Sequence, residues 1–247
     1  MTQDLINTVY TKIGNIGIVE INNPPANYLT SPEFLIIKEL NDYIKINALK
    51  GIVITGKGRH FCAGASMDSL QSLSNIQNSE SIIKKGKDLL NAIENLSIPV
   101  VAAIRGVCYG GGLEIALACH IRVCSENTHF SFPETGLGLI PGLGGTIRFP
   151  LIIGKSEALK VILDNSIISA SEAKAMKLVD YISPNKDVVD FSVQLLNRLT
   201  QSKSQEVIQA VVSSINNAFS LNFANALEEE TKLFCSLASK ASLYKNE

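Results

Sequence analysis

One carboxylate stands in an otherwise apolar run, directly after three glycines, in the stretch GVCYGGGLEIALACH that ends at His120. An ionised carboxylate is rarely fully buried, and burying it without a partner is costly. Glu114 therefore lies either at a surface or beside a site that uses its charge. The glycines come between an apolar run, 99–106, that predicts a buried strand and a pattern that predicts a helix over about 110–119.

A strand–glycine–helix junction of this kind can hold negative charge. The first amides of a helix have no partner inside it, and glycines let a ligand approach the backbone. The positive end of the helix dipole adds to the attraction. The junction could therefore stabilise an oxyanion, although the glycines could equally serve close packing of strand and helix.

A second glycine bend, GRHFCAGAS, follows the apolar strand pattern GIVITG at 51–56. Gly64 permits an unusual backbone and would leave the amide of Ala65 pointing inward. Two amides from separate loops can hold one oxyanion from two sides.

Glu134, in FSFPETG, supplies a second carboxylate. Two carboxylates beside one site can divide acid and base work if their environments separate their pKa values. Glu114 could also be an ordinary first-turn acid and Glu134 an ordinary loop or capping acid. The sequence does not by itself bring the two together.

The elements that must position these residues alternate between strand and helix along most of the chain. TVYTKI and IGIVEI around Gly14-Asn15 predict a hairpin, and Ser31-Pro32 predicts the start of a helix. Beyond Lys186 the pattern is helical only. Alternation followed by a helical tail predicts an α/β fold, which we divide into a core with the site, 1–190, and a helical oligomerisation region, 191–247.

Composition narrows the classes of function. The 247 residues are 46% hydrophobic with a net charge of −1, which argues against a nucleic-acid partner. No apolar run reaches the ~20 residues of a membrane span, and the first residues do not read as a signal peptide. Five cysteines without a CxxC pair are typical of a reducing compartment, so we expect a cytoplasmic protein without a membrane partner.

The sequence suggests two other chemistries. The group Cys119, His120, Cys124 and His129 fits no zinc spacing, so no metal is expected. Residues 106–110 form a GxCxG elbow, and Cys108 could be the nucleophile of a thiol hydrolase. That scheme needs an acid followed by a histidine, but both later histidines precede the candidate acids Asp164 and Asp180. It stays a remote alternative.

Four motifs occur in order between about residues 8 and 182: NNPPANYL, GKGRHFCAGAS, IPVVAAIRGVCYGGGLEIALACHIRV and FSFPETGLGLIPGLGGTIRFPLIIG. Together they resemble the successive motifs of the crotonase (enoyl-CoA hydratase/isomerase) superfamily. The resemblance implies a crotonase-like spiral of ββα turns with a helical C-terminal region, assembled as a homotrimer or a dimer of trimers. It implies an acyl thioester as substrate, held through its oxygen in an oxyanion hole, and no separate cofactor.

The motifs of that family carry over residue by residue. Ala65 and Gly111 match the two oxyanion amides, and Glu114 and Glu134 match the two hydratase glutamates. The matching substrate-binding positions are Ala26, Ala63, Ser66 and Met67. The implied reaction adds water to a 2-enoyl thioester, with hydroxyl going to C3 and a proton to C2. We assign proton exchange at C2 to Glu134 and orientation of the water to Glu114.

Several alternatives stay open within this resemblance. A Δ3,Δ2-enoyl isomerase needs chiefly the base at Glu134, so Glu114 favours a hydratase. The usual acids of the family are replaced by Ser66 and His120. The chain ends at Glu247, short of a segment that often covers the CoA nucleotide, as in polyketide-pathway members that act on acyl-carrier-protein thioesters. A non-catalytic binding role is disfavoured because both acids and both glycine bends are present.

Overall fold

The computed structural model describes residues 7–74, 79–184 and 187–240. The chain begins with an antiparallel hairpin of β1 (Asn7–Ile13) and β2 (Ile16–Asn22), which turns at Gly14 with a φ of 59°. This hairpin was predicted from the sequence and is confirmed.

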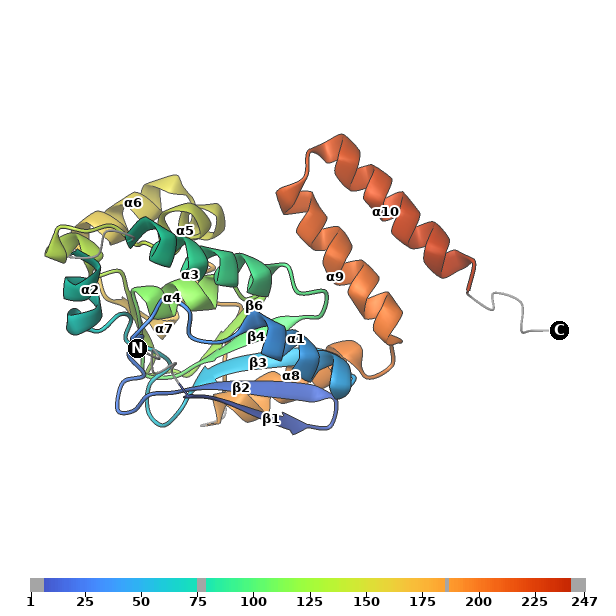
Figure 1. The fold of residues 1–247 in the computed structure, drawn as a ribbon, viewed down its shortest axis with the longest axis horizontal. Coiled ribbons are helices and arrows are strands. Elements are labelled where there is room, and N and C mark those ends of the chain that lie inside the picture. Colours follow the sequence, from blue (N-terminus) through green and yellow to red (C-terminus); the bar gives the residue numbers. More distant parts are fainter. Residues whose placement is uncertain (1–6, 75–78, 185–186, 241–247) are drawn as a thin grey trace.

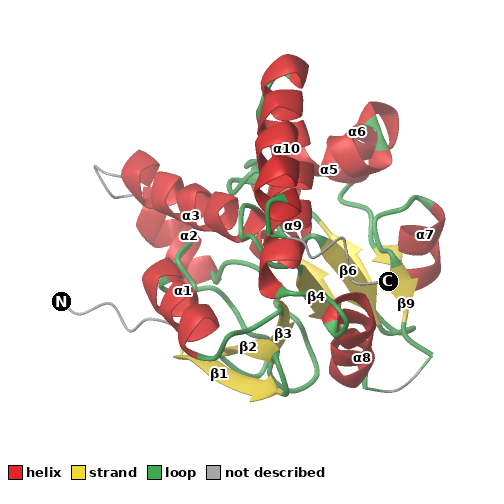
Figure 2. Ribbon diagram, turned by 90° about the vertical axis from the view of Figure 1, so that its right-hand side faces the viewer, coloured by secondary structure: helices red, strands yellow, loops and turns green. Residues whose placement is uncertain are grey.

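A six-stranded sheet forms the centre of the fold, in the order β1-β2-β3-β4-β6-β9. From β2 onward all neighbours are parallel. The added strands are β3 (Gly51–Gly56), β4 (Val100–Ile104), β6 (Ile121–Cys124) and β9 (Tyr181–Ile182). Both β3 and β4 are buried along their whole length, as expected for parallel strands covered on both faces. Figure 2 shows the sheet among its helices.

A smaller sheet has the order β5-β7-β8 and comprises β5 (Val107–Tyr109), β7 (His129–Ser131) and β8 (Ile168–Ser169). β5 follows β4 after a bend at Gly106. The apolar run at 99–106 therefore supplies β4 to the large sheet, and the residues directly after it supply β5 to the small sheet. Together with the helices between the strands, this arrangement confirms the predicted α/β spiral.

Alternate residues of the large sheet face two clusters of buried side chains. Ile52 and Ile54 of β3 pack in the larger cluster, together with side chains of α3 (Ser79–Glu94) and α4 (Gly111–Leu117). Val53 packs in the smaller cluster, against α8 (Val188–Thr200). The predicted division after residue 190 therefore falls inside a helix that packs on the sheet; as a domain boundary it stays a prediction.

The remaining helices surround this centre. They are α1 (Ile37–Ile46), α2 (Met67–Ser74), the short 3₁₀ helix η1 (Glu134–Leu137), α5 (Gly145–Ile153), α6 (Lys155–Asp164), α7 (Ala170–Ala175), α9 (Gln205–Ser220) and α10 (Phe223–Ala238). The last two form a helical hairpin that projects from the rest of the chain (Figure 1). Helix α10 has no buried residue.

The start of α1 differs from the sequence prediction. Ser31 does not cap a helix; its Oγ accepts a hydrogen bond from the amide of Glu33 in a local turn. The helix begins at Ile37 because the intervening residues are held in the core instead. Phe34 is fully buried, and its carbonyl accepts a 2.6 Å hydrogen bond from Thr8 on β1.

Two expectations rest on residues outside the described ranges. The expectation that the chain does not start with a signal peptide concerns residues 1–6. The expectation of an acyl-carrier-protein substrate was based on the C-terminal residues 242–247. Over the ranges that are described, no helix has both the length and the apolar character needed to cross a membrane.

Candidate active site

The two glycine bends lie in contact with each other. Gly64 has a φ of 87°, and a β-carbon placed on it would lie 3.4 Å from the amide nitrogen of Gly111. A β-carbon on Gly111 would in turn lie 4.0 Å from the Cα of Gly64. A side chain at either position would fill the space between the bends. The structure therefore brings the segments of Ala65 and Gly111 side by side.

Both amides are placed to donate outside their own elements. Ala65 forms a parallel bridge with Leu29, in which the amide of Leu29 donates to Gly64 and that of Ser66 donates to Leu29. This pattern leaves the amide of Ala65 pointing away from Leu29. Gly111 is the first residue of α4, so its amide has no acceptor within the helix. One small acceptor between the bends could receive both hydrogen bonds.

Asn27 supports the first bend and was missed by the sequence analysis. It is fully buried with a φ of 54°. Its Nδ2 donates to the carbonyls of Lys57, His60 and Phe61, while its Oδ1 accepts from the amide of Asn23. Asparagine tolerates the left-handed region better than most residues. The only signal in the sequence was its place in a proline- and asparagine-rich turn.

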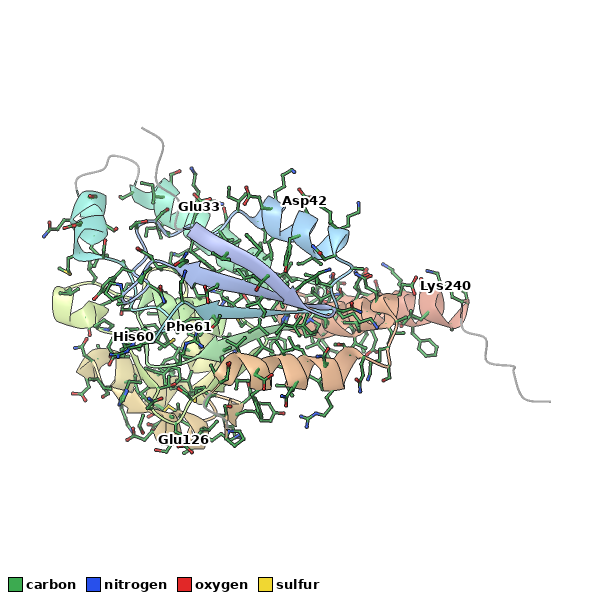
Figure 3. The ribbon with its side chains drawn as sticks, turned by 90° about the horizontal axis from the view of Figure 1, so that it is seen from below. Glu33, Asp42, His60, Phe61, Glu126 and Lys240 are labelled. Atoms are coloured by element: carbon green, nitrogen blue, oxygen red, sulfur yellow. The ribbon has the colours of Figure 1, made fainter. Side chains whose placement is uncertain are left out.

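His60 has a structural role and is not placed as a base. Its Nδ1 accepts a 3.1 Å hydrogen bond from the amide of Val107, which ties the first bend to β5. In Figure 3, His60 and Phe61 lie at the opposite end of the molecule from Lys240. The hairpin of α9 and α10 therefore extends away from the glycine bends of its own chain.

Glu114 is held by the start of another helix. It is 2% exposed, and its Oε1 accepts hydrogen bonds from the amides of Leu143 (2.6 Å) and Gly145 (2.7 Å). Burial raises the pKa of this carboxyl, while the two amides and the charges of Arg148 and Lys87 oppose the rise. The buried charge is thus partnered mainly by the N-terminus of α5, and not only by the dipole of its own helix.

The carboxyl group of Glu134 lies against Gly110 of the second bend. A β-carbon on Gly110 would lie 2.6 Å from its Oε1. Its Oε2 is buried and has no hydrogen-bond partner in the described part of the chain. Burial, and to a lesser degree the charge of Glu114, raise the pKa of Glu134 to about 7. The two carboxyl groups therefore lie close enough to interact, in different environments.

Asn165 anchors the short helix that begins with Glu134 and was also missed. Its Oδ1 accepts hydrogen bonds from the hydroxyl of Thr135 (2.7 Å) and from the amide of Gly136 (3.1 Å). Its carbonyl accepts from Ser131 at 3.4 Å. Asn165 ends α6 with a φ of 52°, so this contact connects α6 to both ends of the loop that carries Glu134.

The four predicted substrate-binding residues lie along the first bend. The carbonyl of Ala26 accepts from the amide of Ala63 at 3.0 Å. The hydroxyl of Ser66 accepts from the amide of Ser69 and so caps the start of α2. Met67 is 54% exposed at the first position of that helix. Their contact with a substrate stays a prediction.

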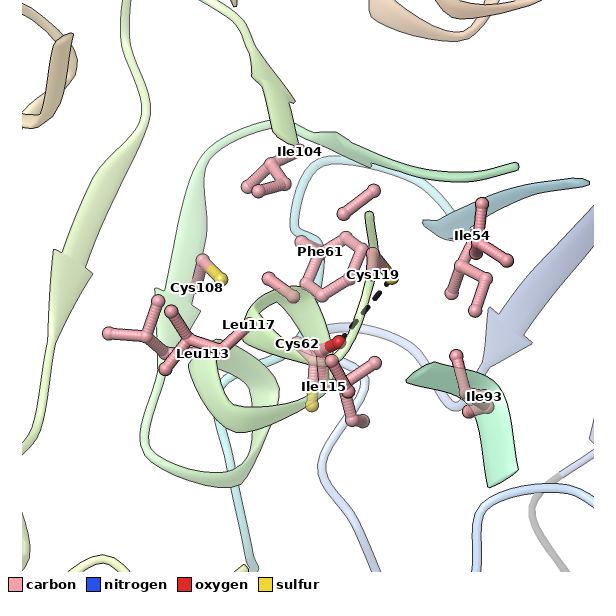
Figure 4. Close-up of a cluster of buried hydrophobic side chains, with 14 of the residues drawn as sticks. Ile54, Phe61, Cys62, Ile93, Ile104, Cys108, Leu113, Ile115, Leu117 and Cys119 are labelled. Atoms are coloured by element: carbon pink, nitrogen blue, oxygen red, sulfur yellow. Dashed lines mark hydrogen bonds between the residues drawn. The ribbon is translucent and has the colours of Figure 1, made fainter. Parts of the chain in front are cut away.

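The thiol-hydrolase alternative does not fit the structure. Cys108 is fully buried in β5, and burial raises the pKa of its thiol well above the usual range. Figure 4 shows Cys62, Cys108 and Cys119 among the apolar side chains around Leu113 and Ile115. A protonated thiol closed off from solvent is not a nucleophile.

The zinc interpretation finds no support either. Across residues 7–74, 79–184 and 187–240, no group of three or more histidine, cysteine, aspartate or glutamate side chains could hold a metal ion. His120 instead accepts a hydrogen bond on Nδ1 from the amide of Val100 at 3.0 Å, which connects the end of α4 to the start of β4.

The spiral of strands and helices and the two facing bends define a protein of the crotonase superfamily. A profile of the enoyl-CoA hydratase/isomerase family matches residues 11–246. A probable enoyl-CoA hydratase of Bacillus subtilis (strain 168) is 34% identical over 223 residues, covering 89% of this chain and 85% of that protein. This chain therefore belongs to the enoyl-CoA hydratase/isomerase family, and it is an enzyme.

Two further proteins are similar to this chain. The fatty acid oxidation complex subunit alpha of Idiomarina loihiensis is 36% identical over 200 residues, covering 78% of this chain and 28% of that longer protein. The solved structure of DspI from Pseudomonas aeruginosa superposes with a TM-score of 0.85 at 26% identity, covering 98% of this chain and 99% of that one.

Proposed function

We propose that this enzyme adds water across the double bond of a 2-enoyl thioester. The proposal is supported by the contact between the two glycine bends and by two carboxyl groups of different character near the second bend, Glu134 against Gly110 and Glu114 in the helix that follows. The thioester oxygen would accept from the amides of Ala65 and Gly111, which stabilise the enolate as charge develops there. No metal or cofactor is needed for this chemistry.

The environments of the two acids support a division of roles. Among the described residues, both hydrogen bonds to Glu114 go to Oε1, so Oε2 can accept from the attacking water. Glu134 is suited to give and take a proton at neutral pH, because its pKa is about 7 and its Oε2 has no partner among the residues that the structure describes. The water oxygen forms a bond to C3, the π electrons move toward the thioester, and Glu134 delivers a proton to C2 and takes up the proton that the water loses.

An isomerase would move a proton between carbons with one base and needs no oriented water. The two-amide cradle around Glu114 therefore favours hydration over isomerisation. The distinguishing experiment follows absorbance of the conjugated double bond on 2-enoyl- and 3-enoyl-CoA. Loss of absorbance with the 2-enoyl substrate supports hydration, whereas gain with the 3-enoyl substrate as the only turnover would establish isomerisation.

The glutamates are the direct test of the mechanism. We expect Glu114→Gln and Glu134→Gln each to lower the hydration rate by roughly 10²–10⁴-fold while a saturated acyl-CoA still binds. Glu126→Gln is the matched control, because Glu126 is exposed on the loop before β7. Turnover like wild type in either site variant would reject the assignment of that glutamate.

We propose that the acyl group is carried by CoA, which the name of the Bacillus subtilis relative specifies. The name of the matched oxidation-complex subunit suggests fatty acid metabolism. The alternative carrier is acyl carrier protein. Presenting the same enoyl group on each carrier separates the two, and a strong preference for carrier protein would overturn the choice of CoA.

We also propose that the chain assembles through its helical hairpin as a homotrimer or a dimer of trimers. Helices α9 and α10 and their connection expose large apolar side chains, most of all Phe219 (86%), Phe223 (81%) and Phe234 (70%). Burying such side chains against another copy is favourable. Light scattering on the full chain tests this, and a monomer at micromolar concentration would contradict it.

A further inference from the structure

Arg148, on α5, joins two elements that sequence reasoning did not connect. Its Nε and Nη2 donate to one oxygen of Glu94 at 2.9 and 2.8 Å, and Nη2 also donates to Asn91 at 2.6 Å. Both acceptors lie on α3. The side chain of Arg148 is only 11% exposed, against 45% for Glu94, so the guanidinium sits beneath its partner.

The same guanidinium reaches the bend that holds Glu114. Its Nη1 donates to the carbonyl of Leu143 at 3.1 Å, while the amide of Leu143 donates to Glu114. Gly144 has a φ of 107°, and a β-carbon on it would lie 2.4 Å from Nη1. The guanidinium therefore lies directly against the bend that aims two amides at Glu114.

We propose that Arg148 is a positioning residue for Glu114: it fixes the 143–145 bend against α3 and thereby holds the two amides that orient the carboxylate. This inference rests on the proposed hydratase role of Glu114. A planar guanidinium can bind Asn91, Glu94 and the Leu143 carbonyl at once, because its donors are arranged in a rigid fork. An ammonium group is a point charge on a flexible stem and cannot span these acceptors in the same way.

Charge and position can be separated by experiment. The charged groups that act on Glu114 or interact with it are Arg148 from α5, Lys87 from α3 and Glu134 from η1. Arg148→Met removes both the charge and the fork, whereas Arg148→Lys keeps the charge and removes only the fork. Lys84→Met is the matched control, since it breaks an exposed ion pair with Asp88 on the same helix α3.

The kinetic expectation is a split between kcat and KM. Arg148→Met should lower kcat for 2-enoyl-CoA hydration roughly 10- to 100-fold, because small displacements of a catalytic group have effects of that size, and should change KM less than about threefold. Arg148→Lys should show most of the decrease in kcat that is expected for Arg148→Met. Lys84→Met should match wild type in both constants.

A second readout does not depend on turnover. The Glu114 carboxyl, labelled with ¹³C and assigned through Glu114→Gln, should titrate at higher pH than in wild type in both variants. The shift should be larger in Arg148→Met, because that variant loses the charge as well as the amide contacts. If wild type shows no hydration, the proposed function fails and this titration still tests the contact. A wild-type titration in Arg148→Lys, or a loss of kcat matched by an equal rise in KM, overturns the proposal.

Discussion

The carboxyl group of Glu134 lies directly against the backbone of Gly110, the residue that precedes the helix carrying Glu114. A β-carbon on Gly110 would lie 2.6 Å from Oε1 of Glu134 and 3.4 Å from its Cδ. Gly110 has a φ of 51° and a ψ of −123°, a combination essentially restricted to glycine. The second glycine bend therefore provides both an amide donor and the space that the acid occupies.

Gly110→Ala should displace Glu134 and strain the bend. We expect hydration to fall by about two orders of magnitude and the free energy of unfolding to fall by about 1–3 kcal/mol. Gly14→Ala is the control, because Gly14 also has a positive φ but has no atom within 4 Å of the added carbon. If both variants kept full activity, the close contact at Gly110 would have no functional consequence.

Glu134→Gln should stabilise the fold at alkaline pH. The folded state raises the pKa of this carboxyl from 4.5 to about 7, so ionisation is easier in the unfolded chain. The resulting cost grows as pH rises from about 4.5 to 7 and is fully present above 7. After allowance for partial exposure, we expect Glu134→Gln to gain about 2 kcal/mol at pH 8.5 and less at pH 5.5, measured by urea unfolding. A gain that shrinks with rising pH would contradict this sign.

Asn165→Gly should reduce turnover more than stability. It keeps the left-handed backbone of Asn165 but removes the oxygen that accepts from Thr135 and Gly136, so the start of η1 keeps only the contact of the Thr135 hydroxyl with the carbonyl of Ile162. We expect kcat to fall roughly tenfold with a small loss of unfolding free energy. Asn165→Asp keeps the acceptor and should retain most of the activity. Equal activity in all three proteins would show that Asn165 does not position Glu134.

Asn27→Asp should strongly destabilise the fold, although aspartate and asparagine side chains have nearly the same shape. The amide of Asn27 donates to three backbone carbonyls, and a carboxylate in its place has no donor for any of them. We expect a loss of about 3–5 kcal/mol for Asn27→Asp and about 2–4 kcal/mol for Asn27→Ala, from chemical denaturation. If Asp were tolerated better than Ala, the donor role of Asn27 would be wrong.

The longer strands were predicted because each is a short apolar run with a clear turn signal, whereas β5, β8 and β9, with two or three residues each, were not predicted. The hairpin at Gly14, β3 and β4 follow from local patterns alone. The start of α1 was predicted five residues too early, since Ser31 and Pro32 resemble a helix start while the burial of Phe34 depends on partners far along the chain. A prediction from local residue types fails where the same residues pack against distant parts of the chain.

For the site, the sequence by itself determined the chemistry that was available: two glycine bends, two carboxylates and motifs in a family order. Only the tertiary structure decided that the two glycine bends touch and that the start of α5 holds Glu114. The same is true of three supporting contacts: Asn27 with the first bend, Arg148 with the 143–145 bend, and Asn165 with the start of η1. The physical reason is that each of these contacts joins segments from different elements. Burial, and the pKa of about 7 that it produces at Glu134, exists only after the chain has folded around the carboxyl group.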